Sequence, residues 1–197
     1  MEGLEHLPLE GNLRQPWRNG GGWTREIARG PENAGTGWDW RLSVAEVEAD
    51  GPFSAFPGID REIVLLSGAG MALDFADGRR HRLDPVSPRL RFGGDDALDC
   101  RLLDGPTTDF NLMWSRARCQ AELWLRPLVG GSVVCAEPGE TWAVHLQAGR
   151  IECPDVDGLH LASGDTLLLH PRPQRRKLRL EASGSAIVVR IRPVATG

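Results

Sequence analysis

The chain has 197 residues, of which 41% are hydrophobic and 25% are charged, and its formal net charge is −4. This composition is typical of a folded globular protein, and the slight negative charge gives no general attraction to nucleic acid or to anionic membranes. No apolar stretch approaches the roughly 20 residues that cross a bilayer, and the first residues lack the basic and apolar regions of a signal peptide. We therefore expect a cytoplasmic protein with neither nucleic acid nor a membrane among its partners.

A run of three glycines is the first distinctive feature along the chain. It lies in residues 17–26, which read Trp-Arg-Asn-Gly-Gly-Gly-Trp-Thr-Arg-Glu. Glycine loses more conformational entropy on folding than other residues, so such a run indicates a backbone with positive φ or a close approach to a neighbour. The run is not a phosphate-binding P-loop, because Gly-Lys-Ser/Thr is missing. It is either a loop that contacts a ligand or a tight turn that leads into a strand.

Short alternating runs follow, separated by Gly and Pro, as is typical of an all-β sandwich or barrel. Residues 38–47 form the clearest predicted strand, with Trp40, Leu42 and Val44 on one face and Arg41 and Ser43 on the other. Residues 50–58 between strands predict an ordered loop with its two phenylalanines tucked in. Further strands are predicted at 23–28, 62–66, 71–75, 110–114, 122–126, 141–146, 166–170 and 186–191.

A weak internal repeat relates the two halves of the chain. A strand, an Asp-Gly hairpin turn, a second strand and a glycine-containing corner occur around Asp77-Gly78 and again around Asp157-Gly158. This succession is typical of cupin jelly rolls, and two copies suggest a bicupin.

Five motifs, in order, resemble those of the HutD/Ves family. They are Trp17-x-Asn-Gly-Gly-Gly-x-Thr-x-Glu26, Trp40-Arg-Leu-Ser-Val-Ala45, Gly51-Pro-Phe-Ser-x-Phe-Pro-Gly-Ile-Asp-Arg61, Leu66-x-Gly-x-Gly70 and Asp109-Phe-Asn-Leu-Met113. The resemblance implies an all-β bicupin with two jelly-roll (double-stranded β-helix) barrels of the RmlC-like cupin type. We place the barrels at residues 1–115, with the glycine-rich motif and a pocket, and at 116–197. The resemblance also implies a link to bacterial histidine utilisation, with a small-molecule binding and regulatory role for which N-formylglutamate and urocanate are candidate ligands.

The sequence lacks the residues that several common metal sites and catalytic mechanisms require. The histidines His6, His81, His145, His160 and His170 form no His-x-His pair, and the four cysteines form no Cys-x-x-Cys pair, so we expect no metal and no other cofactor. His81 and His160 follow Asp-Gly turns and are expected to be exposed hairpin residues. The chain has no tyrosine to act as the acid of a sugar-epimerase cupin and no Gly-x-Ser-x-Gly elbow. We therefore assign no catalytic residue and favour a protein without turnover.

Polar residues on strands form the predicted site. Alternation puts Thr24 with Glu26, and Asp109 with Asn111, on one face of their strands. Such a face either meets solvent or lines the mouth of a barrel. A guanidinium offers a planar fork of donors that grips a carboxylate. The predicted ligand-binding residues, for a small anionic metabolite, are Asn19, Gly20, Thr24, Glu26, Arg41, Ser43, Ser54, Arg61, Asp109 and Asn111.

The sequence leaves several alternatives open. Arg41 and Glu26 are equally consistent with an internal ion pair that fixes strand register. Trp17 and Trp23 flank the glycines and are candidate pocket walls. The functional alternatives are a metal-free enzyme that uses Glu26 or Asp109 as general base and a closed-barrel interaction module; a homodimer is also possible. If Arg61 is a pocket residue near the surface, Arg61→Ala is expected to abolish ligand binding and to change stability by no more than about 1 kcal/mol. A loss of several kcal/mol would instead mark Arg61 as half of a buried structural pair.

Overall fold

The computed structural model describes residues 3–31 and 37–194. The chain forms two compact units: an N-terminal unit of Leu13–Arg118, and a C-terminal unit that joins Met1–Asn12 to Cys119–Gly197. We expected barrels at 1–115 and 116–197. The difference at the start of the chain arises because β1 (Leu4–Leu7) pairs antiparallel with β15 (Thr166–Leu169). Backbone hydrogen bonds to a distant strand thus assign these residues to the C-terminal unit.

The described residues are almost entirely strand and turn. The one helix among them is a single 3-10 turn, η1 (Leu9–Gly11), so the described part of the chain contains no helix long and apolar enough to span a membrane.

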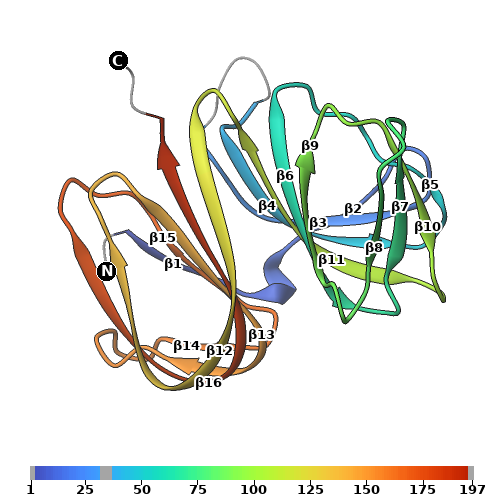
Figure 1. The fold of residues 1–197 in the computed structure, drawn as a ribbon. Helices are drawn as coiled ribbons and strands as arrows, with labels where there is room; N and C mark the ends of the chain where they lie inside the picture. Colours follow the sequence, from blue (N-terminus) through green and yellow to red (C-terminus); the bar gives the residue numbers. More distant parts are fainter. Residues whose placement is uncertain (1–2, 32–36, 195–197) are drawn as a thin grey trace. The chain divides into compact units, whose positions relative to one another are not determined.

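The N-terminal unit consists of two sheets (Figure 1). The six-stranded sheet has the order β2 (Arg14–Pro16), β3 (Gly22–Gly30), β4 (Trp40–Val47), β11 (Thr107–Ser115), β6 (Ile59–Ser67) and β9 (Arg89–Gly93). The four-stranded sheet has the order β5 (Gly51–Pro52), β10 (Leu98–Leu102), β7 (Met71–Phe75) and β8 (Arg80–Leu83).

The core of this unit lies between the two sheets. Ile63 and Leu65 from the larger sheet form one buried cluster with Leu73, Leu83 and Cys100 from the smaller sheet. The outer face of the smaller sheet instead carries charged residues that form exposed ion pairs, such as Asp74 with Arg101. This alternation fixes which side of every strand looks into the unit.

The C-terminal unit is built on one curved sheet. Its order is β1, β15, β13 (Thr141–Glu152), β16 (Arg176–Pro193) and β12 (Cys119–Ala136), with β14 (His160–Ala162) paired to β13. β12 and β16 each have 18 residues and are paired along their whole length. Figure 1 shows both strands bending strongly, so that the sheet wraps around its own apolar face.

All the predicted strands are present, and most are longer than expected. The hairpin of β7 and β8 turns at Asp77-Gly78, and the corresponding turn after β13 contains Asp157-Gly158, as the internal repeat predicted. The loop after β5 also holds its aromatics inward, because Phe53 and Phe56 lie against the guanidinium of Arg61.

A buried histidine in the C-terminal unit predicts acid sensitivity. His145 is 3% exposed, its Nδ1 lies 2.9 Å from Thr166 Oγ1, and burial lowers its pKa to about 4. In the unfolded chain His145 takes up a proton near pH 6.5. The free energy of unfolding is therefore unaffected by His145 above that pH and decreases as the pH falls from 6.5 towards 4. At pH 4.5 we expect His145→Gln to remove about 2 to 3 kcal/mol of this acid destabilisation, measured by urea unfolding at pH 7 and 4.5. Equal pH dependence in the wild type and the variant would contradict this assignment.

Candidate functional site

Backbone geometry accounts for two of the three glycines, Gly20 and Gly22. Gly20 has φ +73°, and a Cβ on Gly22 would lie 2.2 Å from the Glu46 carbonyl oxygen on the adjacent strand. The Gly20 amide donates to Trp17 O at 3.0 Å, and the Gly21 amide donates to Asn19 Oδ1 at 3.1 Å. The run thus forms the tight turn between β2 and β3, and these two donors already have acceptors within the turn.

Several predicted residues lie outside the interior of the unit. Asn19, Gly20 and Ser54 are exposed. The two tryptophans that flank the glycines have different environments. Trp17 packs against the core and donates from Nε1 to Thr24 Oγ1 at 2.8 Å. Trp23 instead lies beneath the guanidinium of Arg14 at 4.0 Å, on the side of β3 away from that core.

The remaining predicted residues share one face of the six-stranded sheet. In the antiparallel register Asn111 lies opposite Ser43, and Asp109 lies opposite Leu65. Directly opposed residues point to the same side of a sheet, and Leu65 belongs to the core that packs against the smaller sheet. This face therefore looks into the unit. Eight of its polar members, which we call the inward polar cluster, are Thr24, Glu26, Arg29, Arg41, Ser43, Arg61, Asp109 and Asn111.

Arg61 is the most deeply buried cation of this cluster, with 7% of its surface exposed. Its Cζ lies 5.2, 5.6 and 5.0 Å from the ring centroids of Phe53, Phe56 and Phe92. Nη2 donates to Asn111 Oδ1 at 2.8 Å, whereas the buried Nε has no hydrogen-bond partner among the described residues. Loss of solvation lowers the pKa of Arg61 to about 10.

Asp109 is the buried carboxylate that interacts electrostatically with this arginine. It is 1% exposed, and its Oδ1 accepts a hydrogen bond from Asn111 Nδ2 at 2.5 Å. Its Oδ2 has no partner within the described part of the chain. Burial raises the pKa of Asp109 to about 7, an effect larger than the opposing influence of Arg61. Asn111 thus bridges a buried cation and a buried carboxyl group that is about half protonated at neutral pH.

Glu26 joins two further arginines. Its Oε2 lies 2.9 Å from Arg41 Nε, and its Oε1 lies 3.5 Å from Arg29 Nε. The internal ion pair between Arg41 and Glu26 that the sequence left open is therefore present. Arg29 was not predicted, because strict alternation places it on the opposite face from Glu26. A β-bulge between Glu26 and Ala28 changes the register and brings Arg29 opposite Arg41.

His81 enters the same interior from the smaller sheet. It lies opposite the fully buried Leu73 in the β7–β8 pair, so its side chain points inward. Its Nε2 is buried and has no hydrogen-bond partner among residues 3–31 and 37–194. The expectation of an exposed hairpin histidine is wrong for His81, whereas His160 is exposed as expected. Alternation would have found His81, because it shares its strand face with Leu83.

The charge of Arg61 is incompletely matched within this cluster. Arg41 pairs with Glu26, whereas the carboxyl group that interacts with Arg61 is Asp109, whose pKa is raised to about 7. An unpaired buried charge is costly, and buried polar atoms normally have partners. A small anion that accepts from Arg61 and from a protonated Asp109 would satisfy both.

Within the described residues, no three His, Cys, Asp or Glu side chains are grouped in a way that would hold a metal ion. The cysteines are unbridged: Cys100, Cys119 and Cys153 are buried and Cys135 is exposed.

Several known proteins resemble this chain in sequence and fold. The family model described as HutD matches residues 10–189. An uncharacterized 21.2 kDa protein in the hutC 3′ region of Pseudomonas putida is 41% identical over 125 residues, which span 62% of this chain and 64% of that protein. The match thus covers less than two thirds of that relative's length.

Two solved structures resemble the whole chain. HutD from Pseudomonas fluorescens SBW25 is 29% identical with a TM-score of 0.86, covering 98% of this chain and 100% of that one. A conserved protein of unknown function from Pseudomonas aeruginosa PAO1 is 30% identical with a TM-score of 0.83, covering 98% and 99%. Two further structures at 9% identity, with TM-scores of 0.71 and 0.64, share the fold alone. The predicted all-β bicupin fold class is confirmed.

Proposed function

Since the chain belongs to the HutD family, as its motifs predicted, we propose that its N-terminal unit binds a small carboxylate metabolite at the inward polar cluster and acts without turnover. The observation that carries this proposal is the environment of Arg61. A buried guanidinium enclosed by three phenylalanine rings has one amide acceptor and an Nε without a partner. A ligand carboxylate would supply both the missing acceptor and the missing negative charge.

The candidate ligands follow from the family resemblance and the chemistry of the cluster. Urocanate and N-formylglutamate are carboxylates that also carry an imidazole or a formamide group. Asn111 and Ser43 lie beside each other on adjacent strands of the inward face and offer the amide and hydroxyl groups that would bind such a second polar group. The link to histidine utilisation is part of this proposal, and its support is the family and the hutC region named for the relative.

Arg41 provides a test that avoids the most buried residue. Arg41→Lys keeps a positive charge to pair with Glu26 but loses the planar fork that holds a carboxylate. We expect N-formyl-L-glutamate or urocanate at a hundred times its dissociation constant to stabilise the wild type by about 2.7 kcal/mol, a rise in Tm of about 5 to 10 °C. Calorimetric titration of Arg41→Lys with the same compound is expected to show binding weakened about tenfold or more.

Arg25→Lys is the matched control, because Arg25 forms a similar pair with Glu46 across the same two strands at 3.2 Å. It is expected to bind as the wild type does. If none of urocanate, N-formyl-L-glutamate, histidine and glutamate shifts Tm, the proposal fails and the closed-barrel interaction module takes its place. Equal weakening in both lysine variants would also count against a site at Arg41.

A second candidate is a metal-free enzyme in which Asp109 is the general base. It is favoured by the raised pKa of about 7, near the value that suits proton transfer at neutral pH, and by the unpartnered Oδ2. Chromatographic assay of any stabilising compound after incubation separates the two. Unchanged ligand supports binding alone, whereas conversion that Asp109→Asn abolishes would establish the enzyme.

A further inference from the structure

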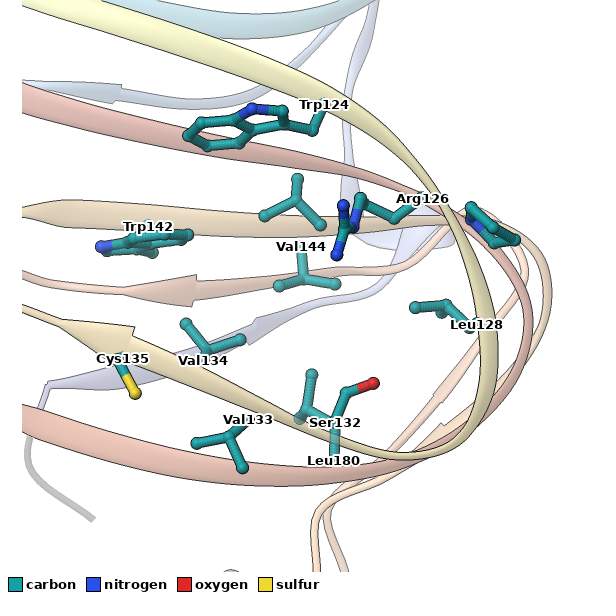
Figure 2. Close-up of a pocket in the computed structure, with 12 residues that line it drawn as sticks. Trp124, Arg126, Leu128, Ser132, Val133, Val134, Cys135, Trp142, Val144 and Leu180 are labelled. Atoms are coloured by element: carbon teal, nitrogen blue, oxygen red, sulfur yellow. The ribbon is translucent and has the colours of Figure 1, made fainter.

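The C-terminal unit contains a cavity of its own, with a volume of about 400 Å3. It lies entirely between strands of this unit. The bend in β12 places residues 124–128 on one side of the cavity and residues 132–135 on another, while β13 and β16 form its floor (Figure 2). Ligand pockets commonly measure about 300 to 1,000 Å3, so this volume suits a small organic molecule.

The walls of the cavity are largely apolar. Val144 and Val188 lie opposite each other in the β13–β16 pair and form part of the floor, with Leu180 farther along β16. Trp124 and Trp142 line the cavity at its other end, with ring centroids 6.0 Å apart and an interplanar angle of 18°. These stacked indoles are a flat, preformed wall against which a planar apolar group packs.

Two arginines near the indoles differ in their partners. Arg190 is held in place, because its guanidinium lies 5.5 and 5.8 Å from the two indole centroids and forms ion pairs with Glu122 and, at 3.7 Å, with Glu140. Arg126 lies two residues beyond Trp124 on the same strand face, opposite the buried Ala186. Figure 2 shows its guanidinium reaching into the cavity between Trp124 and Leu128.

Arg126 is thus the one cationic side chain that lines this cavity, and it forms no ion pair or hydrogen bond with the described residues. An exposed arginine at an apolar mouth binds an anionic group while the rest of the ligand is buried. Val133 at the rim is 56% exposed, which leaves apolar surface for a ligand to cover.

We infer that the C-terminal unit has a second ligand site, distinct from the inward polar cluster, for a small molecule with a planar apolar body and one anionic group. The apolar body packs between the valines and the Trp124–Trp142 pair, and the anionic group binds Arg126. The site requires no contribution from Arg61, Asp109 or their neighbours.

The test uses two fluorescent probes that differ in charge. One is 8-anilinonaphthalene-1-sulfonate, an anionic aromatic molecule, and the other is N-phenyl-1-naphthylamine, which has the same ring system without the sulfonate. Each is titrated into the full-length wild type and into Arg126→Gln. We expect the dissociation constant of the sulfonate to rise about tenfold in the variant and that of the neutral probe to change less than about twofold.

Two further variants complete the experiment. Arg150→Gln removes a charge from an exposed position on β13 that does not line the cavity, and it is expected to bind both probes as the wild type does. Ser132→Phe, at a half-exposed lining position, fills the cavity and is expected to weaken binding of both probes about tenfold or more, with an unchanged far-UV circular dichroism spectrum.

Equal effects of Arg126→Gln and Arg150→Gln on the sulfonate would overturn the role of Arg126. Undiminished binding of both probes to a folded Ser132→Phe would show that they bind elsewhere and would overturn the site. Because all three substitutions lie in the C-terminal unit, these outcomes are independent of whether a histidine-pathway carboxylate binds to the N-terminal unit.

Discussion

Replacing Arg61 with methionine is expected to destabilise the protein by about 3 kcal/mol at pH 8. Methionine retains apolar contact with Phe53, Phe56 and Phe92 but removes the charge. At this pH Asp109 is above its pKa of about 7 and is mostly ionised, so the variant loses the cation that favours this carboxylate, a loss that proton uptake by Asp109 limits to about 1.4 kcal/mol. The rest of the destabilisation arises because the buried Asn111 Oδ1 loses its donor, Arg61 Nη2. Guanidinium chloride unfolding at pH 8 measures the loss.

The pH dependence distinguishes this cause from a packing defect. As the pH falls through about 7, Asp109 becomes protonated in the folded protein, and the destabilisation by Arg61→Met is expected to shrink. In the double variant Arg61→Met/Asp109→Asn no carboxyl group is left to ionise, so the pH-dependent part of the loss is expected to disappear. A loss below about 1 kcal/mol at pH 8 would contradict the buried pair. The sequence alone allowed that small effect, because it left open whether Arg61 lies near the surface.

The second large effect is expected in the glycine run, where Gly22→Ala should destabilise the protein by about 3 kcal/mol or more. The added Cβ would lie 2.2 Å from the carbonyl oxygen of Glu46 and 3.2 Å from Trp17 Cζ3. The first of these atoms is backbone in the β3–β4 ladder, so relief requires the two strands to separate. Thermal unfolding of the purified variant tests this.

The neighbouring glycines are internal controls. Gly21→Ala is expected to cost less than about 1 kcal/mol, because its Cβ would meet only the Asn19 side chain at 3.4 Å. Gly20→Ala has open space but a φ of +73°, which predicts an intermediate cost of about 1 to 2 kcal/mol. Equal effects at all three positions would mean that loss of chain flexibility, rather than the contact with Glu46, explains the run.

Local pattern determined the strands and their faces. Alternation over residues 40–47 and 107–115 correctly grouped Arg41 with Ser43 and Asp109 with Asn111, because the side-chain period of a strand is a local property. The Asp-Gly turns and the triple glycine were recognisable for the same reason, since they reflect the backbone conformations open to a few adjacent residues. The family followed from motifs that are written in the sequence itself.

Pairing between strands that are distant in the chain decided which strand faces pack together and which residues surround each buried side chain. The bulge in β3 brings Arg29 to Glu26, and the register of β7 with β8 turns His81 inward. The bulge is not visible from residue spacing, whereas the alternation that groups His81 with Leu83 was a usable signal. The burial of Arg61 depends on three phenylalanines from two separate segments of the chain.

The same reason explains the boundary of the C-terminal unit and its cavity. β1 belongs to this unit only because its backbone pairs with a strand more than 150 residues away, and the cavity exists only because a paired 18-residue strand bends around its own apolar face. The sequence by itself determined the strands, their faces and the family, since these depend on neighbouring residues. The tertiary structure decided burial, charge balance and cavities, because these depend on contacts between residues that are distant in the chain.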